Sequence, residues 1–301
     1  MISTTKRERS FMNRKLIPGL LAILLTACVT AGDAPARPTP AGHLVLIGGG
    51  NKPDVVMRKF VELAGGKDAP IVVIPTASEA EDTPQYYEDL FRKELGSTDV
   101  VVLPIREKAD ANRPDLVAAA ARARGVFFGG GDQSRITRAL LGTPVLDAIR
   151  QAHRSGAVIG GTSAGTACQS RHMITGEGDF TVIRAGSVEL VEGLGFIEGI
   201  ILDQHFIARQ RSNRLMSVVL EHPDHLGVAV DEDTAAWFRP DGTFEVMGDR
   251  SVMVIDPVGQ PVRTSTADDG KGLLGIHGMR THILLPGEVF DTVKREVVSS
   301  R

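Results

Sequence analysis

The stretch Ala157-Val158-Ile159-Gly160-Gly161-Thr162-Ser163-Ala164-Gly165 decides the fold of this chain and carries its best candidate for chemistry. An apolar run ends in glycines, a threonine and a serine, and small residues follow. This pattern is typical of a buried strand that enters a sharp turn and leaves it as a helix. A serine on such a turn has an exposed hydroxyl with backbone N–H groups nearby, so Ser163 is a candidate nucleophile. The alternative interpretation is a tight turn that needs small residues for packing alone.

Apolar strand-like runs alternate with helix-like runs before and around this turn. The predicted strands cover residues 43–47, 71–75, 100–103, 126–128 and 158–159, and the predicted helices cover about 53–63, 86–95, 116–123 and 136–152. Strands buried on both faces read as continuous apolar runs. The alternation therefore predicts an α/β fold with a mostly parallel sheet flanked by helices.

After about residue 175 the chain becomes rich in short strand-like runs. They cover residues 199–202, 227–230, 235–238, 244–246 and 251–255, and Asp241-Gly242 is a hairpin-turn signal between two of them. This pattern predicts an antiparallel, strand-rich C-terminal extension. We expect one α/β domain over residues 43–301 rather than two domains.

The first 42 residues do not read as part of that domain. Basic residues precede the apolar run 16–27, which is too short to span a bilayer as a stable helix and ends directly before Cys28. Residues 1–27 resemble a bacterial lipoprotein signal peptide, in which Cys28 would become the lipidated first residue, and residues 28–42 read as a flexible tether. We therefore expect an exported protein, lipid-anchored to the outer membrane or in the periplasm, or extracellular. A plain secretory signal is the alternative.

Composition and motif spacing give no indication of several classes of protein. The net charge of −3 gives no indication of a nucleic-acid partner, and no group of Cys and His has the spacing of a metal site. The glycine run 48–50 lacks the spacing of a dinucleotide-binding turn. We therefore expect no cofactor and no metal. With Cys28 lipidated, Cys168 would stand alone, and we interpret it as a buried small residue rather than a nucleophile.

A nucleophilic serine needs a base, and His205 is the best of the eight histidines. It follows the short apolar run 199–202, which places it at a strand end. If that strand joins the parallel sheet, His205 lies on the same rim as Ser163. A surface or core role is the alternative for a histidine taken alone.

Four stretches occur in a specific order along the chain. They are Gly129-Gly130-Gly131-Asp132-Gln133, Gly160-Gly161-Thr162-Ser163-Ala164-Gly165, Asp203-Gln204-His205-Phe206 and Val230-Asp231-Glu232-Asp233-Thr234-Ala235. Together they resemble the serine peptidase family that contains cyanophycinase and dipeptidase E, over about residues 43–256. The resemblance implies a fold like that of class I glutamine amidotransferases. It also implies Ser163 as nucleophile and His205 as base. The oxyanion hole would be the N–H of Ala164 with one from the glycine run at Gly130 and Gly131.

The resemblance also places an acid between the serine and the histidine. This chain offers Glu177 and Asp179 there, within Gly176-Glu177-Gly178-Asp179. The spacing slightly favours Asp179, but both stay open. Either could instead be a turn residue, which this glycine-rich composition also predicts.

Several polar residues near these motifs are candidates for substrate binding. Gln133 matches a pocket glutamine of the family, and Gln204 precedes the histidine. Three arginines follow it and begin a helix; they are Arg209, Arg211 and Arg214. Paired guanidinium groups suit the capture of a carboxylate, and Asp203 could receive a guanidinium, although a solvated basic face is the alternative.

The resemblance thus implies a serine peptidase that hydrolyses cyanophycin to β-Asp-Arg dipeptides, and a homodimer. Its partners would be a peptide substrate and a membrane, with no nucleic acid. One alternative is an exopeptidase like dipeptidase E, acting on Asp-X or isoaspartyl peptides. The other is a catalytically dead, amidotransferase-like binding protein.

Overall fold

The computed structural model describes residues 42–265 and 272–299, and the structural statements below concern these residues. The chain divides into two units, Met1–Pro38 and Thr39–Arg301. The expected signal segment 1–27, the expected lipidation site Cys28 and residues 28–41 of the expected tether lie outside the described residues. Among the described helices, none combines the length and the apolar character that crossing a bilayer requires.

The main sheet contains a parallel part that matches the predicted α/β core. Its strands are β1 (Leu44–Ile47), β2 (Ile71–Ile74), β3 (Val100–Val102), β4 (Gly125–Phe128) and β5 (Val158–Thr162), in the spatial order β1-β5-β4-β2-β3. Almost every residue of these strands is buried, because helices cover both faces of the sheet. Successive side chains point to opposite faces, so Leu44 and Leu46 pack on one side and Val45 and Ile47 on the other.

The antiparallel part continues the same sheet beyond β1. Its strands are β10 (Thr234–Phe238), β11 (Thr243–Gly248), β16 (Val289–Asp291) and β17 (Glu296–Ser299). β10 pairs antiparallel with β1, and the predicted Asp241-Gly242 turn joins β10 to β11, with Gly242 at φ +85°. The strand-rich C-terminal extension is therefore confirmed.

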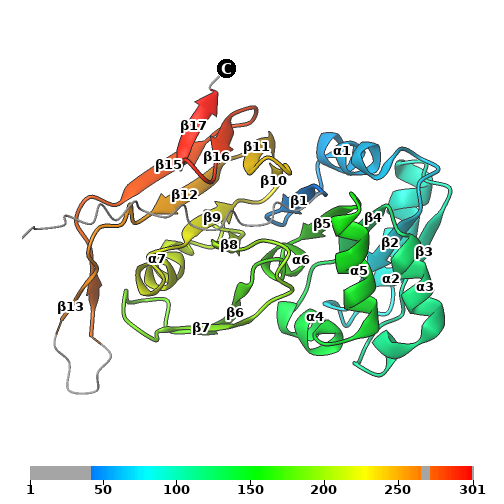
Figure 1. Ribbon diagram of the computed structural model, residues 1–301, viewed down its shortest axis with the longest axis horizontal. Coiled ribbons are helices and arrows are strands. Elements are labelled where there is room, and N and C mark those ends of the chain that lie inside the picture. Colours follow the sequence, from blue (N-terminus) through cyan, green and yellow to red (C-terminus); the bar gives the residue numbers. More distant parts are fainter. Residues whose placement is uncertain (1–41, 266–271, 300–301) are drawn as a thin grey trace, which may run out of the picture. The chain divides into compact units, whose positions relative to one another are not determined.

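Helices cover both faces of the parallel strands (Figure 1). One face carries α1 (Asp54–Ala64), α2 (Thr83–Asp89) and the π-helical turn η1 (Leu90–Glu94), while the other carries the short 3-10 helix η2 (Asp110–Asn112), α3 (Pro114–Arg122), α4 (Gln133–Leu140) and α5 (Pro144–Arg154). Phe60 of α1 and Phe91 of η1 pack against Phe127 of β4, with ring centroids 5.5 and 5.6 Å away. These aromatic contacts fix two helical segments on the sheet.

The single helix expected over 136–152 is two helices. Gly142 at φ +68° ends the first one, and Thr143 caps the second by accepting a hydrogen bond from the Leu146 N–H. Pro144 then occupies the first helical position, where its missing N–H is not needed. The apolar periodicity continues across the break, which is why it reads as one helix in the sequence.

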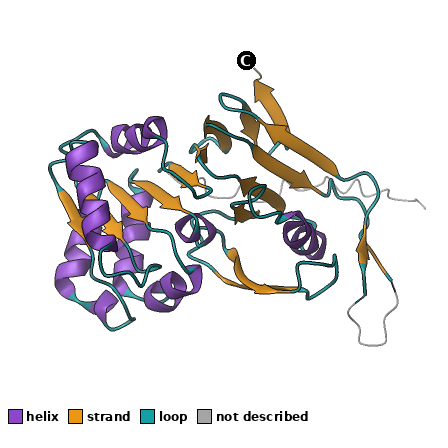
Figure 2. Cartoon of the chain, turned by 180° about the vertical axis from the view of Figure 1, so that it is seen from behind, coloured by secondary structure: helices purple, strands orange, loops and turns teal. Residues whose placement is uncertain are grey.

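A second sheet stands beside the main one, in the order β15-β12-β9-β8. Its strands are β8 (Ile200–Gln204), β9 (Leu226–Val230), β12 (Val252–Asp256) and β15 (Arg280–Leu284), and only β8 and β9 are parallel neighbours. Helix α7 (Ser212–Glu221) lies beside this sheet (Figure 1), and its Leu215 and Val219 pack in the buried cluster between them. Figure 2 shows the same arrangement from behind. Two hairpins complete the described strands: β6 (His172–Gly178) with β7 (Val188–Glu192), and β13 (Arg263–Thr264) with β14 (Leu274–Gly275).

The two sheets meet at the loop that joins β9 to β10. Because β9 belongs to the second sheet and β10 to the main one, this loop lies beside the end of β1. The Asp233 N–H donates to the Gly49 carbonyl at 2.9 Å, and the Gly48 N–H donates to the Thr234 carbonyl at 3.0 Å. The sequence placed His205 on the rim of Ser163 on the condition that its strand joins the parallel sheet. In the structure this strand, β8, does not join that sheet. It reaches the same rim from a second sheet.

Candidate active site

Ser163 occupies the turn between β5 and the short helix α6 (Ala164–Ala167), with φ 53° and ψ −111°. A positive φ is unfavourable for a residue with a Cβ, so surrounding contacts must hold it. The Ser163 N–H donates to the Ile47 carbonyl at 3.0 Å, and Thr166 Oγ1 donates to the same oxygen at 2.6 Å. These bonds tie the turn to β1, so that Ser163 lies where β1 and β5 end.

The glycine at position 161 is required by the close return of the chain. A Cβ on Gly161 would lie 2.2 Å from the carbonyl oxygen of Gly165. The small residues around Ser163 are therefore needed for the strained backbone of the serine, and not for packing alone.

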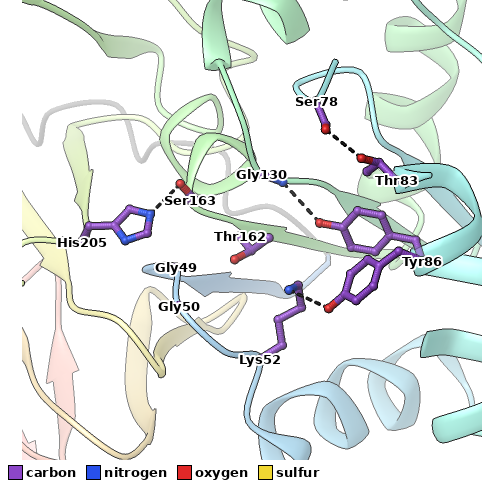
Figure 3. Close-up of a pocket in the computed structure, with 11 residues that line it drawn as sticks. Gly49, Gly50, Lys52, Ser78, Thr83, Tyr86, Gly130, Thr162, Ser163 and His205 are labelled. Atoms are coloured by element: carbon purple, nitrogen blue, oxygen red, sulfur yellow. Dashed lines mark hydrogen bonds between the residues drawn. The ribbon is translucent and has the colours of Figure 1, made fainter. Parts of the chain in front are cut away.

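His205 follows β8 and lies next to Ser163. Its Nε2 lies 2.8 Å from Ser163 Oγ (Figure 3). Its Nδ1 lies 2.6 Å from Oε1 of Glu232. Burial lowers the pKa of His205 below its ordinary value of 6.5, against the raising effect of the Glu232 carboxylate. The imidazole is thus neutral near pH 7. With Nδ1–H donating to the carboxylate, Nε2 is free to accept the serine proton.

The acid that orients His205 is Glu232, and the expectation of Glu177 or Asp179 is corrected. Both of those residues are exposed near the β6–β7 hairpin. Asp179 Oδ1 accepts hydrogen bonds from the N–H and the hydroxyl of Thr181, at 3.0 and 2.5 Å, which lower its pKa. That bonding is typical of a turn residue.

A signal for Glu232 exists in the sequence. The run Val230-Asp231-Glu232-Asp233 places three carboxylates directly after a strand, and that strand is the parallel neighbour of β8. Neighbouring parallel strands end at the same edge. Only the pairing of β8 with β9 turns this into a prediction that an acid meets His205.

Two backbone N–H groups are placed for an oxyanion near Ser163. Ala164 is the first residue of α6, so its N–H has no partner within the helix. Gly130 lines the pocket with Ser163, and its N–H donates to the Tyr87 hydroxyl at 3.3 Å. Gly131 is not among the pocket-lining residues. Its φ of +139° and the 2.2 Å approach that a Cβ would make to the Ala77 carbonyl explain why it is glycine.

Gln133 serves the fold of the neighbouring hairpin. Its Nε2 donates to the carbonyls of Ile174 and Thr175, at 2.8 and 2.5 Å, and the side chain is buried. The sequence predicted that the Gln133 amide binds substrate. In the structure, its N–H groups instead bind the backbone of β6.

Arg214 and Asp203 form a buried ion pair, which corrects their expected roles in substrate binding. The guanidinium donates to the carboxylate in a fork, with Nε 2.8 Å from Oδ2 and Nη2 bonded to Oδ1. The two side chains are 2% and 0% exposed. A charge pair this deeply buried satisfies itself, so neither group is free to receive a substrate.

Arg211 and Gln204 are also bonded to each other. Arg211 Nη1 donates to the backbone carbonyl of Gln204 and to its Oε1, both at 2.7 Å. Burial, together with the charge of Arg214, lowers the pKa of Arg211 to about 10. Arg209 is exposed, and its positive charge lowers the pKa of His205. Of the three arginines, Arg214 is thus buried in an ion pair, Arg211 is half-buried and Arg209 is exposed.

The Ser163–His205 pair opens into a pocket of about 320 Å³ at the C-terminal ends of the parallel strands. Its lining comes from several elements and is drawn in Figure 3, where all but Tyr87 are labelled: Gly49, Gly50, Lys52, Ser78, Thr83, Tyr86, Tyr87, Gly130, Thr162, Ser163 and His205. Sequence reasoning missed Lys52 and the two tyrosines. For Lys52, the sequence offered one indication, its position directly after β1. Ligands collect at the C-terminal ends of parallel strands.

The residues that the structure describes contain no group of three or more His, Cys, Asp or Glu able to hold a metal ion. Cys168 is buried, and burial raises the pKa of its thiol. The groups brought together are a serine, a neutral histidine, a carboxylate and the backbone N–H groups of Ala164 and Gly130. This set can carry out acyl transfer.

Comparison with known proteins agrees with this chemistry. Residues 44–246 match peptidase family S51. The chain is 37% identical over 265 residues to the cyanophycinase of Synechococcus elongatus, covering 85% of this chain and 82% of that protein. It is 38% identical over 260 residues to the cyanophycinase of Nostoc sp. strain PCC 7120, covering 84% and 87%.

A solved structure supports the fold. The crystal structure of a peptidase from an acI-B1 Actinobacterium matches with a TM-score of 0.64 at 23% identity, covering 85% of this chain and 98% of that one. The described elements thus form a fold that is already known among peptidases.

Proposed function

This chain belongs to peptidase family S51, and from that premise we propose that it is a serine peptidase that hydrolyses cyanophycin. Cyanophycin is a polymer with an aspartate backbone and an arginine on each side-chain carboxyl. Two relatives that are 37% and 38% identical to this chain over the aligned residues carry the name cyanophycinase. The products would be β-Asp-Arg dipeptides. The alternative of a catalytically dead binding protein is not favoured, because the chain belongs to a peptidase family.

The observation that carries the mechanism is the line of contacts from Ser163 through His205 to Glu232, at 2.8 and 2.6 Å. In the proposed reaction, neutral His205 takes the hydroxyl proton of Ser163 as Oγ attacks the scissile carbonyl carbon. Glu232 accepts the Nδ1–H bond and stabilises the imidazolium that forms. The N–H groups of Ala164 and Gly130 receive the oxyanion.

The acyl-enzyme then forms and breaks down with the same groups. His205 gives its proton to the leaving amine as the tetrahedral intermediate collapses, leaving an ester on Ser163. Water, deprotonated by His205, attacks that ester and regenerates the serine. Gly130 must exchange its bond to the Tyr87 hydroxyl for the oxyanion during the first step.

Turnover of purified cyanophycin, followed by mass spectrometry of the released peptides, tests the proposal. We expect β-Asp-Arg from the wild type and none above background from Ser163→Ala or His205→Ala. A fluorophosphonate probe should label the wild type and not Ser163→Ala. Release of aspartate from Asp-X dipeptides at a higher kcat/KM than β-Asp-Arg from the polymer would favour the exopeptidase alternative.

Export and lipid anchoring at Cys28 form a second part of the proposal. They are supported by the basic residues, the apolar run 16–27 and the cysteine that follows it. Metabolic labelling with a fatty-acid analogue should mark the wild type in membranes. Cys28→Ala should abolish the label, whereas Cys168→Ala, the matched control, should keep it.

A homodimer is the third part. Its support, besides the resemblance, is a set of exposed apolar side chains near the sheet edges, with Ile283 62%, Leu285 58% and Val298 53% exposed. Light scattering after size exclusion should give twice the mass of one chain, and a monomer at micromolar concentration would contradict it.

A further inference from the structure

Lys52 stands on the pocket wall across from His205. It lies on the loop after β1 and reaches toward helix α2 (Figure 3). Its Nζ donates to the Tyr86 hydroxyl at 3.0 Å and lies 5.0 and 5.9 Å from the ring centroids of Tyr86 and Tyr87. The two tyrosine rings and the hydroxyl of Tyr86 thus hold this ammonium group in place.

The charge of Lys52 has no carboxylate opposite it. In the part of the chain that the structure describes, no ion pair involves Lys52, and its hydrogen bond goes to a neutral phenol. The other ten residues that line the pocket carry no acidic side chain. Glu232 and Asp233 lie behind Gly50, but Glu232 is bonded to His205 and Asp233 accepts the Asn51 N–H. The free charge within the lining is therefore that of Lys52, and it favours a ligand that brings a negative group.

The arginines do not compete for this role inside the pocket. Arg214 is locked to Asp203, Arg211 is bonded to Gln204, and none of the three arginines lines the pocket. Lys52 also does not act as the base, because its bond goes to Tyr86 while Ser163 is bonded to His205. What remains for Lys52 is recognition.

We infer that Lys52 is the residue that binds a carboxylate of the substrate beside the scissile bond, and so selects acidic peptides. The inference rests on the proposed function and deepens it. In a polymer of aspartate with arginine on the side chains, each repeat carries one free carboxylate, that of the arginine. That carboxylate receives a charge-assisted hydrogen bond from Lys52 Nζ, which keeps Tyr86 as its second partner.

The test uses two short oligomers of β-aspartyl-arginine repeats, one with free arginine carboxylates and one with these groups as carboxamides. We expect the wild type to prefer the free acid about 10- to 100-fold in kcat/KM, as expected for one hydrogen bond to a charged group. Lys52→Met should remove most of that preference, mainly through KM for the free acid. Its kcat/KM for the carboxamide should change less than about twofold, since that substrate has no charge to lose.

Two further variants complete the design. Lys52→Arg keeps the charge and should keep most of the preference for the free acid. Lys93→Met makes the same substitution at a lysine outside the pocket, 70% exposed and paired with Asp89, and should behave as the wild type. Fluorophosphonate labelling of Ser163, with an uncharged probe, shows whether each variant retains its catalytic groups.

The outcomes separate this inference from the proposed function. If the wild type cleaves both oligomers equally, or if Lys52→Met loses activity equally on both, the carboxylate role of Lys52 is wrong and the peptidase assignment stands. If the wild type is labelled by the probe but cleaves neither oligomer, cyanophycin is not the substrate, and the role of Lys52 toward it fails with it.

Discussion

Glu232 Oε1 lies 2.6 Å from Nδ1 of His205, although the two residues belong to loops that follow different strands, β9 and β8. Because β8 and β9 are parallel neighbours, their C-terminal ends present both side chains at one edge. The contact completes a line from a carboxylate through an imidazole to the Ser163 hydroxyl. It also fixes which nitrogen of the ring faces the serine.

Replacement of the orienting acid should be costly without abolishing activity. Glu232→Gln is expected to lower kcat about 10²- to 10⁴-fold, because the amide no longer stabilises the imidazolium or fixes its tautomer. Steady-state hydrolysis of cyanophycin measures the effect. Asp179→Asn and Glu177→Gln are the controls and should keep wild-type rates. A loss in either control comparable with that of Glu232→Gln would contradict the assignment.

The pH dependence should report the environment of His205. Protonation of its Nε2 blocks the base, so kcat/KM should fall as the pH drops through the pKa of His205, which burial places below 6.5. The Glu232 carboxylate raises this pKa and the Arg209 charge lowers it. Glu232→Gln should therefore move the acidic limb to lower pH, and Arg209→Gln should move it to higher pH. The Arg209 shift should shrink in high salt, and shifts in the reverse directions would disprove the electrostatic account.

Gly49 keeps the room that the histidine ring needs. A Cβ at this position would lie 2.1 Å from His205 Cε1, and the backbone has φ +117°. Gly49→Ala should displace the ring and lower kcat at least about 100-fold, since a misplacement near 1 Å has this effect. Gly66→Ala is a matched control, because it adds a Cβ at φ +95° with no atom within 4 Å.

The control should separate backbone strain from the clash. Gly66→Ala is expected to lower the free energy of unfolding by about 1 to 3 kcal/mol and to leave kcat unchanged. Urea denaturation and turnover, measured on both variants, make the comparison. Equal losses of kcat in the two variants would show that the contact with His205 is not the cause.

The Asp203–Arg214 pair should behave as a structural element. Arg214→Met leaves a buried carboxylate without a partner and is expected to lower the free energy of unfolding by about 3 to 5 kcal/mol. The double variant Asp203→Leu with Arg214→Met should recover much of that loss. Urea denaturation gives both values. If Arg214→Met instead unfolds like the wild type and only raises KM, the arginine binds substrate after all.

The local pattern of the chain was enough to predict its main elements. Continuous apolar runs such as 71–75 and 126–128 became buried parallel strands, because burial on both faces selects apolar residues at every position. The elbow at Ser163 was readable because a strained turn between strand and helix accepts only small residues around it. The break at Gly142 was missed because a hydrophobic repeat can continue in phase across two helices.

The sequence by itself determined the α/β core, the strand-rich C-terminal part, the position of Ser163 at a strand end and the choice of His205. These depend on short-range periodicity and turn chemistry. Only the tertiary structure decided that β8 lies in a second sheet beside β9, and so that Glu232 orients the histidine. It also decided that Asp203 closes on Arg214 and that Lys52 carries the charge in the pocket. Which polar groups meet depends on strand pairing and on burial, and both arise between segments that lie far apart along the chain.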